Sequence, residues 1–305
     1  MKARKIGFIG LGLMGHGMAK NLVEKGHQLS IIGNRNRAPV EDLVSRGAKE
    51  VKKPSELAAT CDIVFTCVPA STDVEAIVYG ADGFLKSARP GLVHVDCTTA
   101  NPTSTLKIAA DYAAHGVQLV DAGLARGPDN AEAGTLNLIV GAEAGLLEDI
   151  RPVLLCCAEN IFHVGPTGAG HRTKLINNFI AMGMAGLFAD ALTAARATNV
   201  DLSALYEVIS AGGNNSAIFQ IMAKSAMDGD ASRLKFSIGN ARKDMSYFVG
   251  MASDAGMVSL FGPAVLQAFT LATLNGQSDG FVPSISDVLA QLNHLETRRT
   301  GGPVG

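Results

Sequence analysis

The 305-residue sequence predicts an α/β protein, with an N-terminal domain built on a mostly parallel sheet and an all-α C-terminal domain. Up to residue 165, short apolar runs alternate with helical runs, which is the pattern of βαβ units. Beyond residue 170, apolar residues recur at helical spacing and no run typical of a strand appears. We therefore predict domains at residues 1–166 and 167–295, followed by a flexible tail at 296–305.

The predicted strands are short apolar runs separated by turn residues and helical patterns. They cover residues 5–10, 28–34, 62–69, 92–98, 117–123, 135–141 and 160–165, and helices are predicted at 15–26, 40–47 and 73–80. The second domain begins with a helix of nearly thirty residues that ends near Asn199. Shorter helices follow it, and Gly or Asn closes several of them, as is typical of helix C-termini.

The composition excludes several classes of protein. The formal net charge is −2, so no basic excess indicates a nucleic-acid or anionic-membrane partner. Five cysteines without a CxxC pair predict no disulfide framework and suit a reducing cytoplasm. The N-terminus does not read as a signal peptide. Asn177, Asn178 and Asp190 interrupt the most apolar stretch, so no membrane span is expected, and no metal site is predicted.

A glycine motif follows the first predicted strand. Gly10-x-Gly12-x-x-Gly15 lies between this strand and a helix, where glycines permit a tight turn and let the backbone approach a pyrophosphate. This context favours a Rossmann dinucleotide-binding domain whose cofactor loop comprises Gly10, Leu11, Gly12, Leu13, Met14 and Gly15. The alternatives are a simple glycine-rich turn and a methyltransferase site for an adenosyl sulfonium cofactor. His16, next to the loop, is predicted to be exposed.

The end of the second strand indicates which dinucleotide binds. NAD sites usually carry Asp or Glu there, but this strand ends in Gly33, Asn34, Arg35, Asn36 and Arg37. A guanidinium suits a 2′-phosphate through its charge and its paired donors. The prediction is that Asn34, Arg35 and Asn36 bind the cofactor, with NADP preferred and NAD possible. The alternative is a solvated loop with incidental arginines.

The stretch "GAGHRTKLINNF" places Lys174 in an apolar helical segment, with Asn177 and Asn178 three and four residues later. Positions at this spacing share one helix face. A lysine is rarely taken out of water without a partner. The pattern leaves two interpretations, a solvated helix face and a site of proton transfer.

Four segments together resemble the β-hydroxyacid dehydrogenase family. They are the cofactor signature "GFIGLGLMGHGMAKNL", the segment "VDCTTANP", the substrate segment "DAGLARGPDNAEAGTLNLIVGA" and the catalytic helix "GAGHRTKLINN", and "RKDM" matches a late Lys-Asp pair. The family includes 3-hydroxyisobutyrate dehydrogenases, tartronate semialdehyde reductases and sulfolactaldehyde reductases. The resemblance runs from about residue 5 to residue 290.

The resemblance implies a role for each matching residue. Lys174 corresponds to the catalytic lysine, and the pKa of a partly desolvated lysine is lowered, so that it can accept an alcohol proton. Asn178, with Asn177 beside it, corresponds to amides near the substrate, and Thr99 to a hydroxyl near substrate and nicotinamide ribose. The remaining matches are Val68 and Pro69, beside the cofactor; Lys243, closing over the cofactor; and Asp244, helping to hold Lys243.

The substrate segment departs from the family pattern. Where most members read D-A-P-V-S-G-G, this chain has Ala125 for the serine and Arg126 for a glycine. The variant with Arg resembles sulfolactaldehyde reductases, although the Thr and Ser of that subgroup are Gly127 and Pro128 here. We predict that Arg126 and Gly127 help bind a carboxylate or sulfonate of the substrate. The alternative for Arg126 is a surface charge.

The resulting hypothesis is an NAD(P)-dependent oxidoreductase that interconverts a short anionic 3-hydroxy acid and its semialdehyde or ketone. Sulfolactaldehyde reductase, succinate semialdehyde reductase, threonine-type β-hydroxy amino acid dehydrogenase and imine reductase remain alternatives, as does a catalytically silent cofactor-binding module. The long helix from residue 170 is apolar around most of its circumference, which favours a homodimer or homotetramer.

Overall fold

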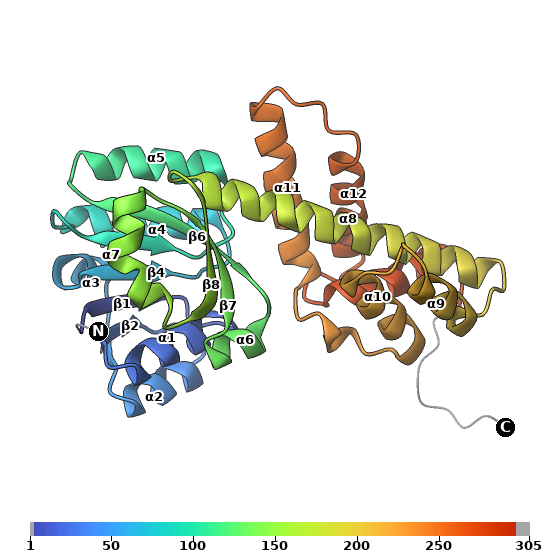
Figure 1. The fold of residues 1–305 in the computed structure, drawn as a ribbon, viewed down its shortest axis with the longest axis horizontal. Coiled ribbons are helices and arrows are strands. Elements are labelled where there is room, and N and C mark those ends of the chain that lie inside the picture. The colour runs from blue at the N-terminus through green and yellow to red at the C-terminus, as the bar shows by residue number, and fades with distance from the viewer. Residues whose placement is uncertain (1–2, 297–305) are drawn as a thin grey trace. The chain divides into compact units, whose positions relative to one another are not determined.

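The structure is a computed structural model that describes residues 3–296 (Figure 1). The predicted tail, except for Glu296, lies outside the described residues. The chain divides into two compact units, an N-terminal unit (Met1–Lys174) and a C-terminal unit (Leu175–Gly305). This division falls inside one long helix, eight residues after the boundary expected from the sequence, because the first turns of that helix pack on the sheet.

The N-terminal unit contains one eight-stranded sheet in the order β3-β2-β1-β4-β5-β6-β7-β8. Neighbouring strands are parallel except β6 and β7, so the predicted mostly parallel α/β fold is confirmed. The strands are β1 (Lys5–Ile9), β2 (Gln28–Ile32), β3 (Lys49–Val51), β4 (Ile63–Thr66), β5 (Val93–Asp96), β6 (Gln118–Ala125), β7 (Leu136–Gly141) and β8 (Ala158–Gly165).

Helices cover both faces of this sheet, because alternate residues of the buried strands point to opposite sides. Ile6 and Phe8 of β1 belong to one apolar cluster, whereas Ile9 belongs to the other. The first cluster includes residues of α1 (Gly15–Glu24), α2 (Ala38–Ser45), α6 (Pro128–Ala133) and α7 (Ala144–Leu154). The second includes residues of α3 (Pro54–Thr60), α4 (Ser71–Tyr79) and α5 (Pro102–Ala113).

The C-terminal unit is helical, as predicted, and its core forms around the long helix α8 (Ala169–Ala197). Met182, Ala185 and Leu192 of α8 are buried, and Phe179 stacks on Phe248 with 4.1 Å between ring centroids. The other helices are α9 (Leu202–Ala211), α10 (Ala217–Asp228), α11 (Ile238–Asp254), α12 (Gly262–Leu274) and α13 (Ile285–Leu292). The side chains of Asp201, Ser216 and Ser237 cap the first turns of α9, α10 and α11.

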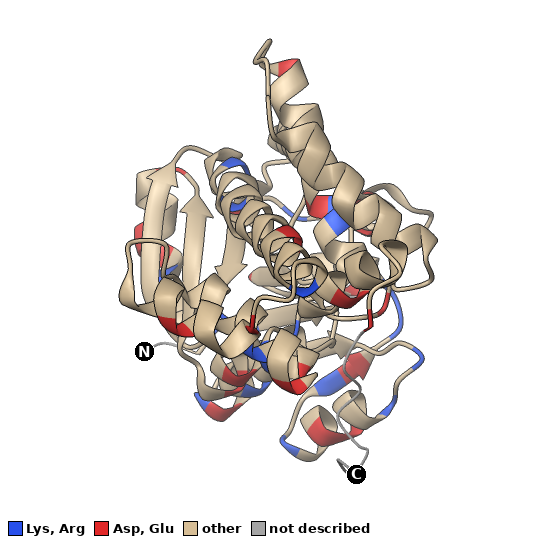
Figure 2. Ribbon diagram, turned by 90° about the vertical axis from the view of Figure 1, so that its right-hand side faces the viewer, with Lys and Arg blue, Asp and Glu red and all other residues tan. Residues whose placement is uncertain are grey.

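Among the described residues, α8 is the one helix long and apolar enough to cross a membrane by length and composition alone. One side of it forms the core of the C-terminal unit, and a buried core helix of a folded domain meets the same criteria. Lys and Arg are interspersed with Asp and Glu over the ribbon, in keeping with the small net charge (Figure 2).

Candidate active site

The glycine loop lies at the carboxyl end of β1, next to the point where the strand order reverses between β1 and β4. Dinucleotides bind at this point in such sheets. Gly10 has φ +100°, and a Cβ there would collide with the carbonyl of Cys67, so the turn requires glycine. A Cβ at Gly12 would meet no protein atom within 4 Å. The loop therefore offers open space at the N-terminus of α1, as a bound pyrophosphate requires.

The two arginines after β2 differ in their surroundings. Arg37 donates two hydrogen bonds of 2.8 Å to the carboxylate of Glu50, and this contact holds the pKa of Glu50 below its usual value. Arg35 is exposed, and no described residue accepts a hydrogen bond from its side chain. Asn34 and Asn36 are also exposed, and their side-chain oxygens accept from the backbone N–H groups of Arg35 and Ala38. Arg35 is thus the arginine available to a ligand.

Val68 and Pro69 follow β4, and Thr99 follows β5, the neighbouring strand. The backbone N–H of Val68 donates to the hydroxyl of Thr98 over 3.2 Å, which ties the two loops together. Since β1, β4 and β5 are parallel, both loops lie at the same sheet edge as the glycine loop. The structure thus gathers the predicted cofactor residues of the N-terminal unit at one edge.

Lys174 is placed by contacts between β6 and the beginning of α8. The buried carboxylate of Asp121 on β6 accepts hydrogen bonds from the N–H groups of Gly168 (2.5 Å) and His171 (2.7 Å) in the first turn of α8. A negative charge is favourable at this end of a helix. A Cβ at Gly123 would lie 2.8 Å from the Cβ of Lys174, so the stem of the lysine lies directly on β6. The ladder between β5 and β6 ends at Asp121, so Gly123 lies beyond the carboxyl end of β5.

The backbone of Arg126 has φ +75°, in the left-handed region that residues other than glycine rarely adopt. Its guanidinium donates to the carbonyl of Thr135 (2.7 Å) and pairs with the carboxylate of Glu159 on β8. Gly127 precedes the short helix α6, and a Cβ there would meet nothing within 4 Å. The predicted anion-binding charge of Arg126 is therefore already paired within the N-terminal unit.

In the C-terminal unit, Asn178, Lys243 and Asp244 form one cluster. The side-chain NH₂ of Asn178 donates to Oδ2 of the buried Asp244 over 2.7 Å. Nζ of Lys243 lies 3.0 Å from Oδ1 of Asp244, in an ion pair without hydrogen-bond geometry. Asp244 thus contacts Lys243 as the family pattern implied. Asn178 is buried, whereas Asn177 is exposed.

His16 corrects one expectation. It was predicted to be exposed, but its ring lies between the carboxylates of Asp42 (2.9 Å) and Glu132 (2.8 Å). Hydrogen bonds from Arg46 and from His16 hold the pKa of Asp42 at about 2. The contacts join the start of α1 to α2 and α6, and residues 26 and 116 positions away gave no local signal of them.

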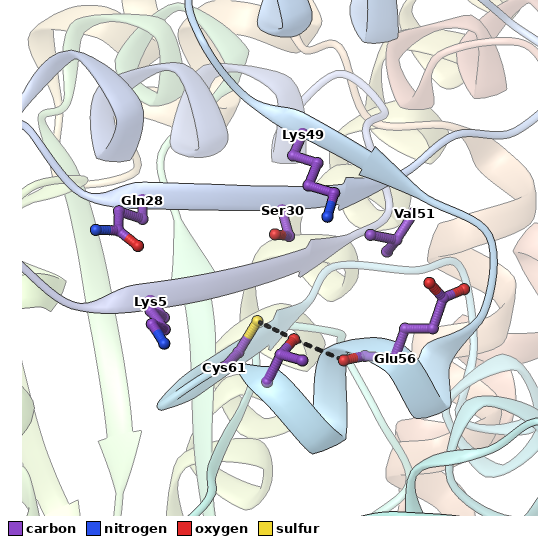
Figure 3. A pocket seen from close by; sticks show the side chains of 8 residues that line it. Lys5, Gln28, Ser30, Lys49, Val51, Glu56 and Cys61 are labelled. Atoms are coloured by element: carbon purple, nitrogen blue, oxygen red, sulfur yellow. Dashed lines mark hydrogen bonds between the residues drawn. The ribbon is translucent and has the colours of Figure 1, made fainter.

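A separate pocket of about 230 Å³ begins at the amino ends of β1 and β2 (Figure 3). The residues that line it are Lys5, Gln28, Ser30, Lys49, Val51, Glu56, Thr60 and Cys61. None of the predicted site residues lines it. No cluster of potential metal ligands occurs among the described residues. The carboxyl edge of the sheet is therefore the better candidate for the active site.

Comparison with known proteins identifies the family. Residues 5–165 match the family described as the NAD binding domain of 6-phosphogluconate dehydrogenase, and residues 168–282 match the NAD-binding domain of NADP-dependent 3-hydroxyisobutyrate dehydrogenase. The chain is 37% identical over 257 residues to 2-(hydroxymethyl)glutarate dehydrogenase of Eubacterium barkeri, covering 84% of this chain and 83% of that protein. The chain belongs to the β-hydroxyacid dehydrogenase family.

A second relative of this β-hydroxyacid dehydrogenase is 3-sulfolactaldehyde reductase of Escherichia coli, 30% identical over 89% of this chain and 91% of that protein. The Mycobacterium tuberculosis 3-hydroxyisobutyrate dehydrogenase solved with L-serine has a TM-score of 0.83 at 24% identity, covers 94% of this chain and 99% of that one, and shows the same fold. The predicted enzyme class and a nicotinamide dinucleotide cofactor are confirmed: the protein is an NAD(P)-dependent hydroxyacid dehydrogenase acting on CH–OH groups.

Sequence reasoning missed two positioning residues of this dehydrogenase, Asp121 and Gly123. Both lie in the segment "DAGLARG", which was interpreted only for its substrate contacts. An aspartate inside an otherwise apolar strand was the available signal, because a buried carboxylate needs hydrogen-bond donors.

Proposed function

We propose that the enzyme interconverts a short anionic 3-hydroxy acid and its semialdehyde or ketone, with Lys174 as general acid and base. The position of Lys174 carries this proposal. Its stem lies on Gly123 of β6, at the carboxyl edge of the sheet where the glycine loop also lies. The curated relatives support the class of substrate, since their names join a hydroxymethyl or aldehyde group to an acid or a sulfonate.

The chain's own residues supply proton transfer and positioning. The glycine loop, Val68, Pro69 and Thr99 would hold the dinucleotide, which would supply the hydride transfer when bound. In oxidation, the neutral amine of Lys174 takes the hydroxyl proton as the carbonyl forms; in reduction, its ammonium group returns a proton to oxygen. Asp121 fixes the first turn of α8, so the amine is positioned before the substrate arrives.

A panel of substrates tests this function. Short semialdehydes and 3-hydroxy acids ending in carboxylate or sulfonate, together with L-serine, L-threonine and a cyclic imine, are assayed by absorbance of the reduced cofactor. We expect the highest kcat/KM for an anionic semialdehyde or hydroxy acid. Turnover of the imine alone would favour an imine reductase, and no turnover with tight cofactor binding would favour a silent binding module.

Arg126 is proposed to bind the anionic end of the substrate, which would replace Glu159 as the partner of the guanidinium. We expect Arg126→Ala to raise the KM of the anionic substrate about tenfold, since a charge-assisted hydrogen bond is lost, and to leave the KM of the cofactor unchanged. Glu159→Gln is the matched control, because it removes the negative charge that pairs with the guanidinium and should not raise the substrate KM. If both variants keep the wild-type KM and lose equal stability, the ion pair is structural.

Arg35 is proposed to bind the 2′-phosphate of NADP. We expect Arg35→Ala to lower kcat/KM for NADPH by about tenfold or more while changing that for NADH less than twofold, because NADH lacks the phosphate. Arg37→Ala is the control, since Glu50 already holds that guanidinium. A wild-type enzyme that prefers NADH would contradict the proposal.

The C-terminal unit is proposed to contribute Asn177 and Asn178 to the binding of the substrate and Lys243 to the binding of the cofactor.

The C-terminal unit also carries a stripe of exposed apolar side chains on α8, formed by Ile176, Ile180 and Leu187 at 47%, 57% and 65% exposure. Such a stripe marks a protein contact. We propose that this stripe is buried between subunits of a homodimer or homotetramer that works in the cytoplasm. Sedimentation equilibrium should then give a mass of two or four chains.

A further inference from the structure

A chain of hydrogen-bonded polar side chains is buried in the N-terminal unit, between the sheet and α5. It comprises Tyr112 on α5, His94 and Asp96 on β5, and Thr66 on β4, and each is at most 3% exposed. Thr66 pairs with Asp96 in the parallel register, and His94 lies two residues earlier on the same side of β5. Tyr112 also belongs to a cluster of buried apolar side chains that includes Val64 and Ile108. A buried polar chain of this kind needs an explanation, because apolar side chains would fill the space at less cost.

The chemistry of the groups fixes the direction of every hydrogen bond. The hydroxyl of Thr66 donates to Oδ1 of Asp96 over 2.8 Å, so it accepts from Nε2 of His94, also at 2.8 Å. Burial lowers the pKa of His94 to about 4, so the ring is neutral near pH 7 and its Nδ1 is an acceptor. The hydroxyl of Tyr112 therefore donates to Nδ1 over 3.0 Å. Each bond polarises the next toward Asp96.

At one end of this hydrogen-bonded network, Asp96 contacts the backbone of the loops that carry the predicted cofactor residues. Oδ1 of Asp96 also accepts from the N–H of Thr98 over 3.0 Å. The hydroxyl of Thr98 in turn accepts from the N–H of Val68. Pro69 and Thr99 are the next residues in the two loops. The buried chain thus holds the backbone of both loops that follow β4 and β5.

A second contact joins the same strand end to the helix of Lys174. Nε2 of His171 donates to the backbone carbonyl of Asp96 over 3.3 Å, and Nδ1 of His171 lies 2.8 Å from the hydroxyl of Thr105. His171 is fully buried and stands one helical turn before Lys174. Asp96 is therefore tied both to the cofactor loops and to the first turn of α8.

We propose that Tyr112, His94, Thr66 and Asp96 form a positioning network that holds the loops at Val68–Pro69 and Thr98–Thr99 in the conformation that binds the dinucleotide. These are positioning residues, since they act through the backbone of the two loops. The proposal rests on the dinucleotide site of the N-terminal unit and is independent of the substrate, of the NADP preference and of the role of Lys174.

The test is the Kd of the reduced dinucleotide, measured by its fluorescence without substrate. NADPH and NADH are both titrated, and the one that wild type binds more tightly is used. We expect Thr66→Val, which removes the central hydroxyl at nearly constant volume, to raise this Kd about tenfold. Thr66→Ser should restore it to within twofold of wild type. Thr193→Val removes a buried hydroxyl of the C-terminal unit and should leave the Kd unchanged despite a similar loss of thermal stability.

Two results would overturn the proposal. One is a folded Thr66→Val protein whose Kd stays within twofold of wild type. The other is a Thr66→Ser protein as impaired as Thr66→Val, because the hydroxyl would then not be the reason. If Thr66→Val does not fold, Tyr112→Phe decides: a Kd raised about threefold supports the network, and an unchanged Kd refutes it.

Discussion

Lys174→Ala is expected to lower kcat about 10²–10⁴-fold, the usual loss when a general acid–base group is removed. The KM values of substrate and cofactor should change much less, because the lysine is assigned to proton transfer. Stopped-flow or steady-state turnover, read by absorbance of the reduced cofactor, measures the effect. Added primary amines of small volume should restore part of the rate, since they can occupy the space left by the side chain.

Arg172→Ala is the matched control for this prediction. Arg172 lies on the same turn region of α8 and is exposed, so its replacement also removes one positive charge. Its kcat should stay within twofold of wild type. Wild-type turnover in Lys174→Ala would remove the lysine from the mechanism, whatever the cofactor affinity.

Gly12→Val is expected to weaken binding of the reduced dinucleotide about 10²-fold without unfolding the protein. The new side chain meets no protein atom within 4 Å of its Cβ, so the glycine loop can keep its structure. It would instead occupy the space needed by the pyrophosphate and displace two or more charge-assisted hydrogen bonds, a loss that corresponds to about this factor. Fluorescence titration gives the Kd, and thermal unfolding reports the fold.

Gly145→Val provides the comparison for Gly12→Val. Gly145 lies on α7 in the same unit, is exposed, and also has no atom within 4 Å of an added Cβ. Its cofactor Kd should equal that of wild type. Equal Kd values for both variants would show that the dinucleotide does not lie against Gly12.

The strands that the sequence predicts well are those buried on both faces. All four residues of Ile63–Thr66 and of Val93–Asp96 are buried, and the predicted strands at 62–69 and 92–98 contain them. Strand β3 was missed because it has three residues, Lys49–Val51, at the edge of the sheet, with two charged side chains. Its pairing with β2 stabilises it, and nothing local in the sequence signals that contact.

Some residues of the candidate site can also be predicted from the sequence, whereas others cannot. The glycine loop and Lys174 are predictable because local motifs carry them. Charge pairing is a different matter, since the partners are distant in the sequence. Glu50 lies 13 residues from Arg37, and Glu159 lies 33 residues from Arg126. The sequence therefore indicates which arginines and lysines are present but not which of them have partners.

Gly123 shows that a residue without a side chain can determine where a neighbouring side chain lies. The stem of Lys174, the proposed acid–base residue, occupies the space on β6 that a side chain at position 123 would take. Libraries aimed at new substrates should therefore keep glycine there and draw their diversity from Arg126 and Gly127. In this enzyme, the first position that we expect to tolerate substitution, Arg126, lies only three residues after Gly123, which must stay glycine.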